Sequence, residues 1–344
     1  MQQQEEKALG KQSFLFGRGV YVGGMASVAG KLESEGPLGA YFDITSGDDM
    51  FGGKTWEEAE SNMQLSAAKA AIDDAGLKAD DIRYMAGGDL LGQLIATTFG
   101  VEKLAIPLMG LYGACSTMGE ALLAGAVLVD GGYAKHTLTI TSSHFAGAEK
   151  QFRFPLAYGN QRPMAATWTV TGSGAVVLSD ERKKYRVRLY GATMGRVIDY
   201  GVKDSMNMGA CMAPAACDTI YQHLKDFSRK PEDYDRIVTG DLGVVGKEIL
   251  IALLQEKGYD ITKQHMDCGI EIYDASTQKT DAGGSGCGCS AVTLTGYLLK
   301  KISEGALKRV LFVPTGALLS TVSFNEGNSV PGIAHAIVLE HCGD

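Results

Sequence analysis

One of the seven cysteines, Cys115, lies in a stretch of small residues between an apolar segment and a segment typical of a helix. The apolar segment covers residues 105–111, and the Ala- and Leu-rich helix is predicted over residues 120–129. A tight turn between them would direct the thiol towards the first free N–H groups of the helix. Because that environment favours the thiolate, the position suits a cysteine nucleophile. The alternative is a cysteine that only packs as a small apolar residue.

A cysteine nucleophile needs partners that move protons and stabilise negative charge, and three candidates flank predicted strands. His144 follows a strand predicted over residues 137–141, and Asp241 follows a strand predicted over residues 236–239. The ends of such strands face the ligand crevice in open α/β sheets. His335 precedes the last predicted strand. Structural roles remain open for all three: His144 could cap a loop, Asp241 could cap a helix, and His335 could be packed.

Composition restricts the class of protein. The chain has 344 residues, 45% of them hydrophobic and 21% charged, and its net charge is −8. These values predict a packed interior and argue against binding to nucleic acid. The sequence shows no apolar run long enough to span a membrane and no secretory signal, so we expect an intracellular protein. Seven irregularly spaced cysteines fit a reducing compartment.

The pair Cys287 and Cys289 is the only cysteine pattern that suggests a metal. Further Cys or His residues at ligand spacing are missing from the sequence around it, so we expect no metal site and no cofactor. The intervening glycine is better explained by a tight turn. The other histidines are expected to be solvated; they are His136, His223, His265 and His341.

Buried β-branched stretches alternate with helical stretches along the whole chain, which predicts an α/β fold. The chain also repeats itself. Residues 80–90 and 232–242 match in pattern, and each ends in Gly-Asp-Leu. Further on, Cys115 and Cys289 each precede a serine, an apolar helical stretch, a glycine turn and a strand. Two matches in the same order predict two similar halves, residues 14–180 and residues 181–342.

Several motifs together resemble the thiolase superfamily. The strand Gly-Ser-Gly-Ala-Val-Val-Leu at residues 172–178 looks like the one that closes the first half of these enzymes, and residues 283–292 occupy a loop that carries a catalytic Asn in some of them. The combination is closer still to the stage V sporulation protein AD family. Its motifs appear at residues 36–39 (Gly-Pro-Leu-Gly), 113–117 (Gly-Ala-Cys-Ser-Thr), 171–177 (Thr-Gly-Ser-Gly-Ala-Val-Val), 212–216 (Met-Ala-Pro-Ala-Ala) and 283–287 (Gly-Gly-Ser-Gly-Cys).

This resemblance implies a thiolase-like fold, with two duplicated α/β halves in five layers of helices and mixed sheets. It also implies binding of dipicolinic acid (pyridine-2,6-dicarboxylic acid), free or as its calcium chelate, within the SpoVA apparatus that loads the developing spore. The protein would then act peripherally at the spore inner membrane through other SpoVA membrane proteins. By analogy with thiolase-fold proteins, we expect a homodimer.

The same resemblance places Asp241 where the superfamily has a catalytic His, and Ser285 near the position of the Asn. An ionised aspartate would repel a developing enolate, so the usual condensing machinery is incomplete and we expect no catalysis. Two alternatives remain: an active acyltransferase that uses Cys115 with His144 or His335, and a scaffold whose pocket is filled.

A dipicolinate site needs cationic or N–H donors for two carboxylates and flat apolar walls. The helix that follows Cys115 could bind one carboxylate, and Arg153 or Arg162 could bind the other. Candidate walls are Phe152, Phe154 and Tyr158. We therefore predict a ligand site that combines Cys115, His144, Arg153, Arg162, Asp241, Ser285 and His335. The alternative is that residues 144–162 form only a solvated flap.

Overall fold

The computed structural model describes residues 7–153 and 161–343. Its largest sheet has two sides that repeat the same strand directions. On each side, moving outwards from the centre, two antiparallel pairings are followed by two parallel pairings. The order is β11 (His265–Asp267), β10 (Arg236–Thr239), β13 (Arg309–Val313), β16 (Ala336–His341), β9 (Val187–Thr193), β2 (Ser13–Ala29), β8 (Gly172–Ser179), β6 (His136–Ser143), β4 (Tyr84–Gly88) and β5 (Leu108–Gly110).

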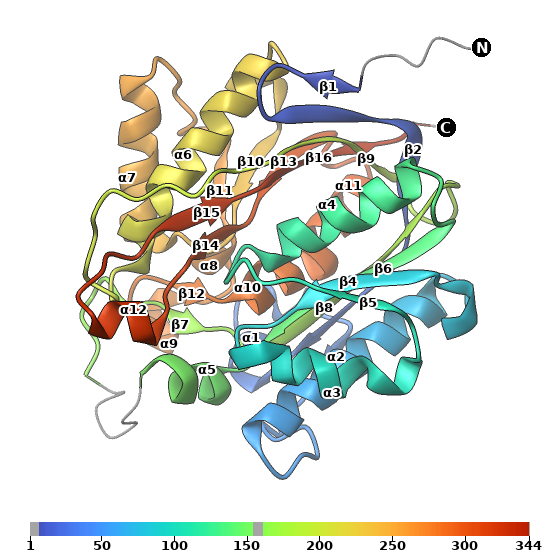
Figure 1. The fold of residues 1–344 in the computed structure, drawn as a ribbon, viewed down its shortest axis with the longest axis horizontal. Helices are drawn as coiled ribbons and strands as arrows, with labels where there is room; N and C mark the ends of the chain where they lie inside the picture. Colours follow the sequence, from blue (N-terminus) through green and yellow to red (C-terminus); the bar gives the residue numbers. More distant parts are fainter. Residues whose placement is uncertain (1–6, 154–160, 344) are drawn as a thin grey trace.

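The long strand β2 joins the two sides. Its first part, from Ser13 to Tyr21, pairs with β9, and its second part, from Tyr21 to Ala29, pairs with β8. Both ladders shift register, between Leu15 and Val20 and between Val22 and Gly24, and such irregularities bend a strand. Figure 1 shows the result: β2 runs along the top of the view and then turns down at the right, so that the two sides of the sheet face each other.

Helices fill the space between the two sides and cover both outer faces, which gives five layers (Figure 1). Each layer of helices has its own apolar core. The central layer holds α4 (Thr117–Asp130), α10 (Cys287–Thr293) and α11 (Leu299–Ser303); the outer layers hold α2 (Trp56–Asp74) and α3 (Ile95–Val101) on one side and α6 (Met208–Asp226) and α7 (Gly243–Glu256) on the other.

Shorter elements complete the fold, and several of them surround Cys115. These are β1 (Ala8–Leu9), α1 (Lys31–Ser34), β3 (Ile44–Thr45), α5 (Phe145–Phe152), β7 (Trp168–Thr169), α8 (Cys268–Glu271), α9 (Ala275–Gln278), β12 (Gly284–Ser285), β14 (Thr315–Ala317), α12 (Thr321–Asn325) and β15 (Gly332–Ala334). Within the described residues, no helix has both the length and the apolar composition needed to cross a membrane.

The α/β prediction is confirmed, and the strand predicted over residues 236–239 has the observed bounds of β10. The expectation that His223 is solvated is wrong. His223 is fully buried in α6, where its ring nitrogens contact Thr193 Oγ1 at 2.7 Å and Tyr234 Oη at 2.6 Å. Burial lowers the pKa of His223 to about 3, so this histidine is neutral and structural.

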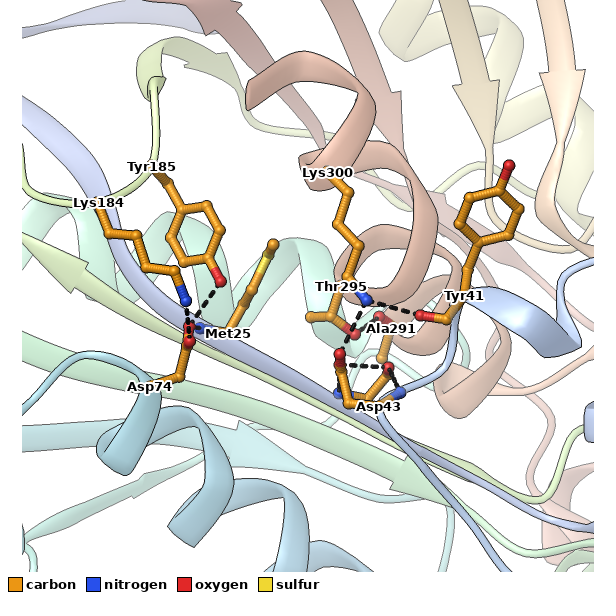
Figure 2. A network of polar contacts seen from close by, with 10 residues as sticks. Met25, Tyr41, Asp43, Asp74, Lys184, Tyr185, Ala291, Thr295 and Lys300 are labelled. Carbon is orange, nitrogen blue, oxygen red and sulfur yellow. Dashed lines mark hydrogen bonds and ion pairs between the residues drawn. The ribbon is translucent and has the colours of Figure 1, made fainter. Parts of the chain in front are cut away.

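Two carboxylates accept hydrogen bonds from backbone N–H groups on the free edge of β2 (Figure 2). Over its second part the strand has β8 on one side, and on the other side only β3 reaches its last residues. Asp74 accepts the N–H of Met25 at 3.0 Å, and Asp43 accepts the N–H of Ser27 at 2.9 Å. Asp74 also binds Lys184 and Tyr185, so α2 is tied to the connection that leads from β8 to β9 (Figure 2). These bonds satisfy strand N–H groups that would otherwise be unpaired.

Replacing Asp74 with Ala removes the acceptor for the Met25 N–H and for the Tyr185 hydroxyl, and we expect a loss of about 1–3 kcal/mol in the free energy of unfolding. The control is Lys184→Ala, which leaves the strand contact of Asp74 in place. It removes the ion pair of a 60% exposed side chain and the contact of its ammonium with the Tyr185 ring, and should change the free energy by less than about 1 kcal/mol. Urea unfolding of both variants measures the difference. Equal effects would show that the ion pair, and not the strand contact, stabilises this edge.

Candidate functional site

Cys115 lies in a turn that joins β5 to α4. The turn is closed by hydrogen bonds from two of its residues, Ser116 and Thr117. Ser116 donates its N–H and its hydroxyl to the carbonyl of Gly113, at 3.1 and 2.8 Å. Thr117 donates its N–H and its hydroxyl to the carbonyl of Ala114, at 3.2 and 2.6 Å. Ala114 adopts a left-handed conformation with φ +50°, which is uncommon for a residue other than glycine. The predicted turn is therefore present, but the N–H groups of Ser116 and Thr117 are used inside it.

Asp241 is the charged group with the largest effect on the pKa of Cys115. It follows β10, is 1% exposed and accepts hydrogen bonds from two other loops. Thr315 Oγ1 donates to Oδ1 at 2.9 Å, and the N–H of Gly286 donates to Oδ2 at 2.9 Å. The thiol of Cys115 lies next to this carboxylate, and each group shifts the pKa of the other. Burial raises the pKa of Asp241 to about 7, although these hydrogen bonds act in the opposite direction.

The expectation that this position favours a thiolate is wrong. Burial raises the pKa of the Cys115 thiol well above its ordinary value, and the charge of Asp241 and the hydrogen bond to it raise that pKa further. Hydrogen bonds from the Gly286 N–H and from Ser285 lower it but do not compensate. Cys115 is therefore protonated at neutral pH.

Ser285 and Gly286 reach the site from β12, immediately before α10. Gly286 has φ +98°, and a Cβ atom at this residue would lie 2.7 Å from Ser143 Oγ. Only glycine fits both conditions, and this conformation presents the Gly286 N–H to Asp241. The structure thus brings Ser285 and Cys115 to the same cavity.

A narrow cavity adjoins Cys115, and we call it the Cys115 cavity. Its volume is about 30 Å³, room for about two water molecules. The apolar part around the thiol includes Leu90, Ala148 and Cys287. The cavity is lined by Leu90, Ala114, Cys115, Ala148, Glu149, Phe152, Arg153, Thr169, Met208, Ser285, Ala317 and Leu319.

Two arginines and one carboxylate form the charged side of this cavity. Glu149 Oε1 accepts hydrogen bonds from Arg153 at 2.9 Å and from Arg162 at 2.6 Å. Of the three, Glu149 and Arg153 line the cavity, and Arg162 lies behind them with a further bond to the carbonyl of Thr167. The group has one carboxylate for two guanidinium ions, so one positive charge remains next to the cavity.

The structure does not bring His144 or His335 to the Cys115 cavity. His144 is the N-cap of α5, and its Nε2 contacts the carbonyl oxygen of Asp49 at 2.8 Å. His335 Nδ1 accepts the N–H of Gly195 at 3.2 Å, and its Nε2 lies 3.3 Å from Glu120 Oε1. Phe154 and Tyr158 lie outside the described residues.

Sequence reasoning missed three residues of the site. Glu149 could have been found, because it stands one helical turn before Arg153 on α5. Asp267 could not, because only the paired strands bring it to the start of α7, where it accepts the N–H groups of Leu242 and Gly243. It thereby takes the capping role that was the alternative for Asp241. Thr315 carries no sequence signal at all.

In the part of the chain that the structure describes, no three His, Cys, Asp or Glu side chains gather as metal ligands. The thiol of Cys287 donates to the carbonyl of Ser142 at 2.9 Å, and that of Cys289 lies 3.6 Å from the carbonyl of Gly240.

Comparisons with known proteins support the family and the fold that the sequence motifs predict. The family described as "Stage V sporulation protein AD (SpoVAD)" matches residues 10–340. Stage V sporulation protein AD of Bacillus subtilis (strain 168) is 44% identical over 337 residues, covering 98% of this chain and 99% of the relative.

Solved structures of condensing enzymes share the fold. Aquifex aeolicus 3-oxoacyl-[acyl-carrier-protein] synthase III gives a TM-score of 0.57 at 15% identity, covering 94% of this chain and 100% of the enzyme. A single-residue variant of Xanthomonas campestris OleA gives a TM-score of 0.60 at 15% identity, covering 95% of this chain and 99% of the OleA chain. The expected thiolase-like fold is thereby confirmed.

Replacing Asp241 with Asn removes the negative charge that raises the pKa of Cys115, so the thiolate fraction at pH 8 should rise. We expect alkylation of Cys115 by iodoacetamide to be slow in the native protein and at least about tenfold faster in the variant, since one pKa unit changes the thiolate fraction about tenfold. Mass spectrometry of the labelled peptides measures the rates. Cys342, a half-buried thiol, provides the internal control and should react equally in both proteins. An unchanged rate at Cys115 would contradict this account of its protonation.

Proposed function

The chain belongs to the stage V sporulation protein AD family, and on that premise we propose that it binds dipicolinic acid in the Cys115 cavity without catalysing a reaction on it. The ligand is the one that the family resemblance implies. It would be bound for uptake into the developing spore, as part of the SpoVA apparatus. The observation that carries the proposal is a cavity lined by both Cys115 and Arg153, in which a protonated thiol and a guanidinium ion face the same space.

The state of the thiol supports the absence of catalysis. A nucleophilic cysteine needs a base that accepts its proton and a thiolate that persists. At this site burial and the charge of Asp241 raise the pKa of the thiol well above its ordinary value, which disfavours a persistent thiolate. Asp241 also offers no N–H donor to an enolate oxygen. These features support a binding role for the residues of a condensing-enzyme fold.

Charge supports the binding of an acid. Arg153 and Arg162 share only Glu149, and a ligand carboxylate next to Arg153 would balance the remaining positive charge. Ser285 also lines the cavity, and its hydroxyl provides a neutral donor. Because the cavity is smaller than a pyridine dicarboxylate, the side chains of Phe152 and Arg153 have to move when the ligand enters.

We further propose that the protein acts peripherally at the spore inner membrane through other SpoVA membrane proteins. Family membership supports this. Fractionation of sporulating cells tests it: the chain should stay with the membrane fraction only while the other SpoVA proteins are present.

Isothermal titration with dipicolinate should show saturable binding, and Arg153→Gln should weaken it at least about tenfold, because a hydrogen bond to a charged group contributes about 1.5–3 kcal/mol. The matched control is Arg196→Gln, which changes an exposed arginine paired with Asp218 on α6 and should bind like the native protein. Absence of heat in the native protein would contradict the proposal.

Incubation with acyl-coenzyme A distinguishes the proposed binding protein from the main alternative, an active acyltransferase. An acyltransferase would leave an acyl adduct on Cys115, detectable by mass spectrometry, whereas the proposed binding protein would not. A filled scaffold would give neither heat nor adduct.

The pH dependence of binding distinguishes free dipicolinate from its calcium chelate. A dianion next to Asp241 favours the protonated carboxyl, whose pKa is already about 7, so the affinity for the free acid should fall several-fold between pH 6 and pH 8. A bound calcium ion favours the ionised carboxylate, and the affinity would then rise over the same range. Titrations with and without Ca²⁺ measure the sign. In Asp241→Asn the dependence should disappear, and its persistence would show that another group titrates.

We also propose that two copies associate through β5, the last strand on one side of the sheet. An unpaired edge strand offers its backbone to another strand, and apolar side chains surround this one. Leu108, Met109 and Phe99 are 40%, 45% and 60% exposed. Light scattering should therefore give twice the chain mass of 36.5 kDa, and Met109→Glu should give monomers. Val322→Glu, at a 67% exposed residue elsewhere, should leave the dimer intact. A monomeric native protein would contradict the proposal.

A further inference from the structure

A second cavity lies on the other side of α5 and β7, and we call it the tryptophan cavity. Its volume is about 220 Å³, compared with about 30 Å³ for the Cys115 cavity. The chain has two tryptophans, and both line this cavity. The complete lining is Leu32, Glu33, Asp49, Trp56, His144, Phe145, Ala146, Trp168 and Thr171.

Aromatic rings from two parts of the chain form its walls. Phe145 and Trp168 are stacked, with ring centroids 4.1 Å apart and an interplanar angle of 13°. Trp56 comes from the first residue of α2. The stacked pair already attracts a cation: the guanidinium of Arg162 lies 4.8 Å from the centroid of Trp168. Arg162 is bound to Glu149 and therefore does not neutralise the cavity.

Glu33 gives the cavity a negative group without a countercharge. Its side chain is 2% exposed and accepts hydrogen bonds from two neutral donors, the N–H of Thr171 at 3.0 Å and the hydroxyl of Tyr273. Among the described residues, no Lys or Arg nitrogen forms an ion pair with it, and no Lys or Arg lines the cavity. Burial raises the pKa of Glu33 to about 7, which reflects this missing compensation.

The other titratable groups of the cavity do not supply the missing charge. His144 is neutral at physiological pH, because burial lowers its pKa. Asp49, which is exposed, adds a second carboxylate. Two carboxylates disfavour a dianion such as dipicolinate. Aromatic faces beside a carboxylate are instead the pattern that recognises organic ammonium ions.

We propose that the tryptophan cavity binds an organic monocation, an alkylammonium or guanidinium group, between its aromatic rings and with Glu33 as the counter-ion. The cation is either a free small molecule or the side chain of a Lys or Arg on a partner protein, and both present the same chemistry. The site is separate from the Cys115 cavity and does not depend on the proposed binding of dipicolinate.

Intrinsic fluorescence tests the proposal directly, because both tryptophans lie in the cavity. Tetramethylammonium chloride and N-acetyl-lysine methylamide are the probes, and sodium chloride at equal ionic strength is the control. We expect a saturable change with at least one probe and none with sodium. The affinity should rise between pH 6 and pH 8 as Glu33 ionises. Binding of tetramethylammonium would indicate a free quaternary ion, and binding of the lysine derivative alone would indicate a protein side chain.

Variants distinguish the contribution of the counter-ion Glu33 to binding from that of the aromatic walls. Glu33→Gln should weaken binding at least about tenfold, and Trp56→Leu should weaken it about fivefold. Asp49→Asn, at an exposed residue that cannot disturb the core, should weaken it about twofold. Tyr133→Leu, at a residue 66% exposed outside the cavity, should have no effect. A native protein that responds to neither probe, or a Glu33→Gln variant that binds as tightly as the native protein, would overturn the proposal. Dipicolinate should bind equally well to Glu33→Gln, so failure here is distinguishable from failure of the proposed function.

Discussion

Burial of the Asp241 carboxylate is the constraint around which the loops of both halves are arranged. A buried carboxylate without partners is unfavourable by several kcal/mol, so donors have to be held close to it. They come from two places: the residue before α10 supplies the Gly286 N–H, and β14 supplies the Thr315 hydroxyl. The Cys115 thiol, in the turn before α4, lies next to the same carboxylate. Gly286 has φ +98°, a backbone conformation that presents its N–H to Asp241. The site is thus a structural junction as well as a candidate binding site.

The same constraint determines what the thiol can do. The strand, turn and helix around Cys115 suit a nucleophile, and the fold is shared with condensing enzymes. Geometry of the turn is not sufficient, however, because reactivity depends on the proton. A carboxylate as hydrogen-bond acceptor stabilises the neutral thiol and opposes the thiolate. A single buried carboxylate next to the thiol therefore favours the protonated cysteine, although the turn itself has the geometry expected for a nucleophile.

Local features were predictable from the sequence, and contacts between elements were not. The strand at residues 236–239 and the turn at Cys115 depend on neighbouring residues, and both are observed. The protonation of Cys115 depends on Asp241, which follows β10 on the opposite side of the sheet and reaches Cys115 only because the two sides face each other. His144 looked like a site residue since it follows a strand, but its ring caps α5 instead. The resemblance predicted the fold and the family. The charge of each cavity could not be predicted, because it depends on contacts between residues that are far apart in the sequence.

The helix α5 and the strand β7 form a shared wall between cavities of opposite charge. On one side, Arg153 and Arg162 outnumber Glu149; on the other, Glu33 has no cationic partner among the described residues. Arg162 could in principle balance both, because its guanidinium stacks on Trp168. Arg162 forms its ion pair with Glu149, however, and Glu33 is bonded by two neutral donors, the N–H of Thr171 and the hydroxyl of Tyr273. The opposite charges of the two cavities therefore follow from the partners of the two glutamates: Glu149 is shared by two arginines, and Glu33 is bonded by neutral groups.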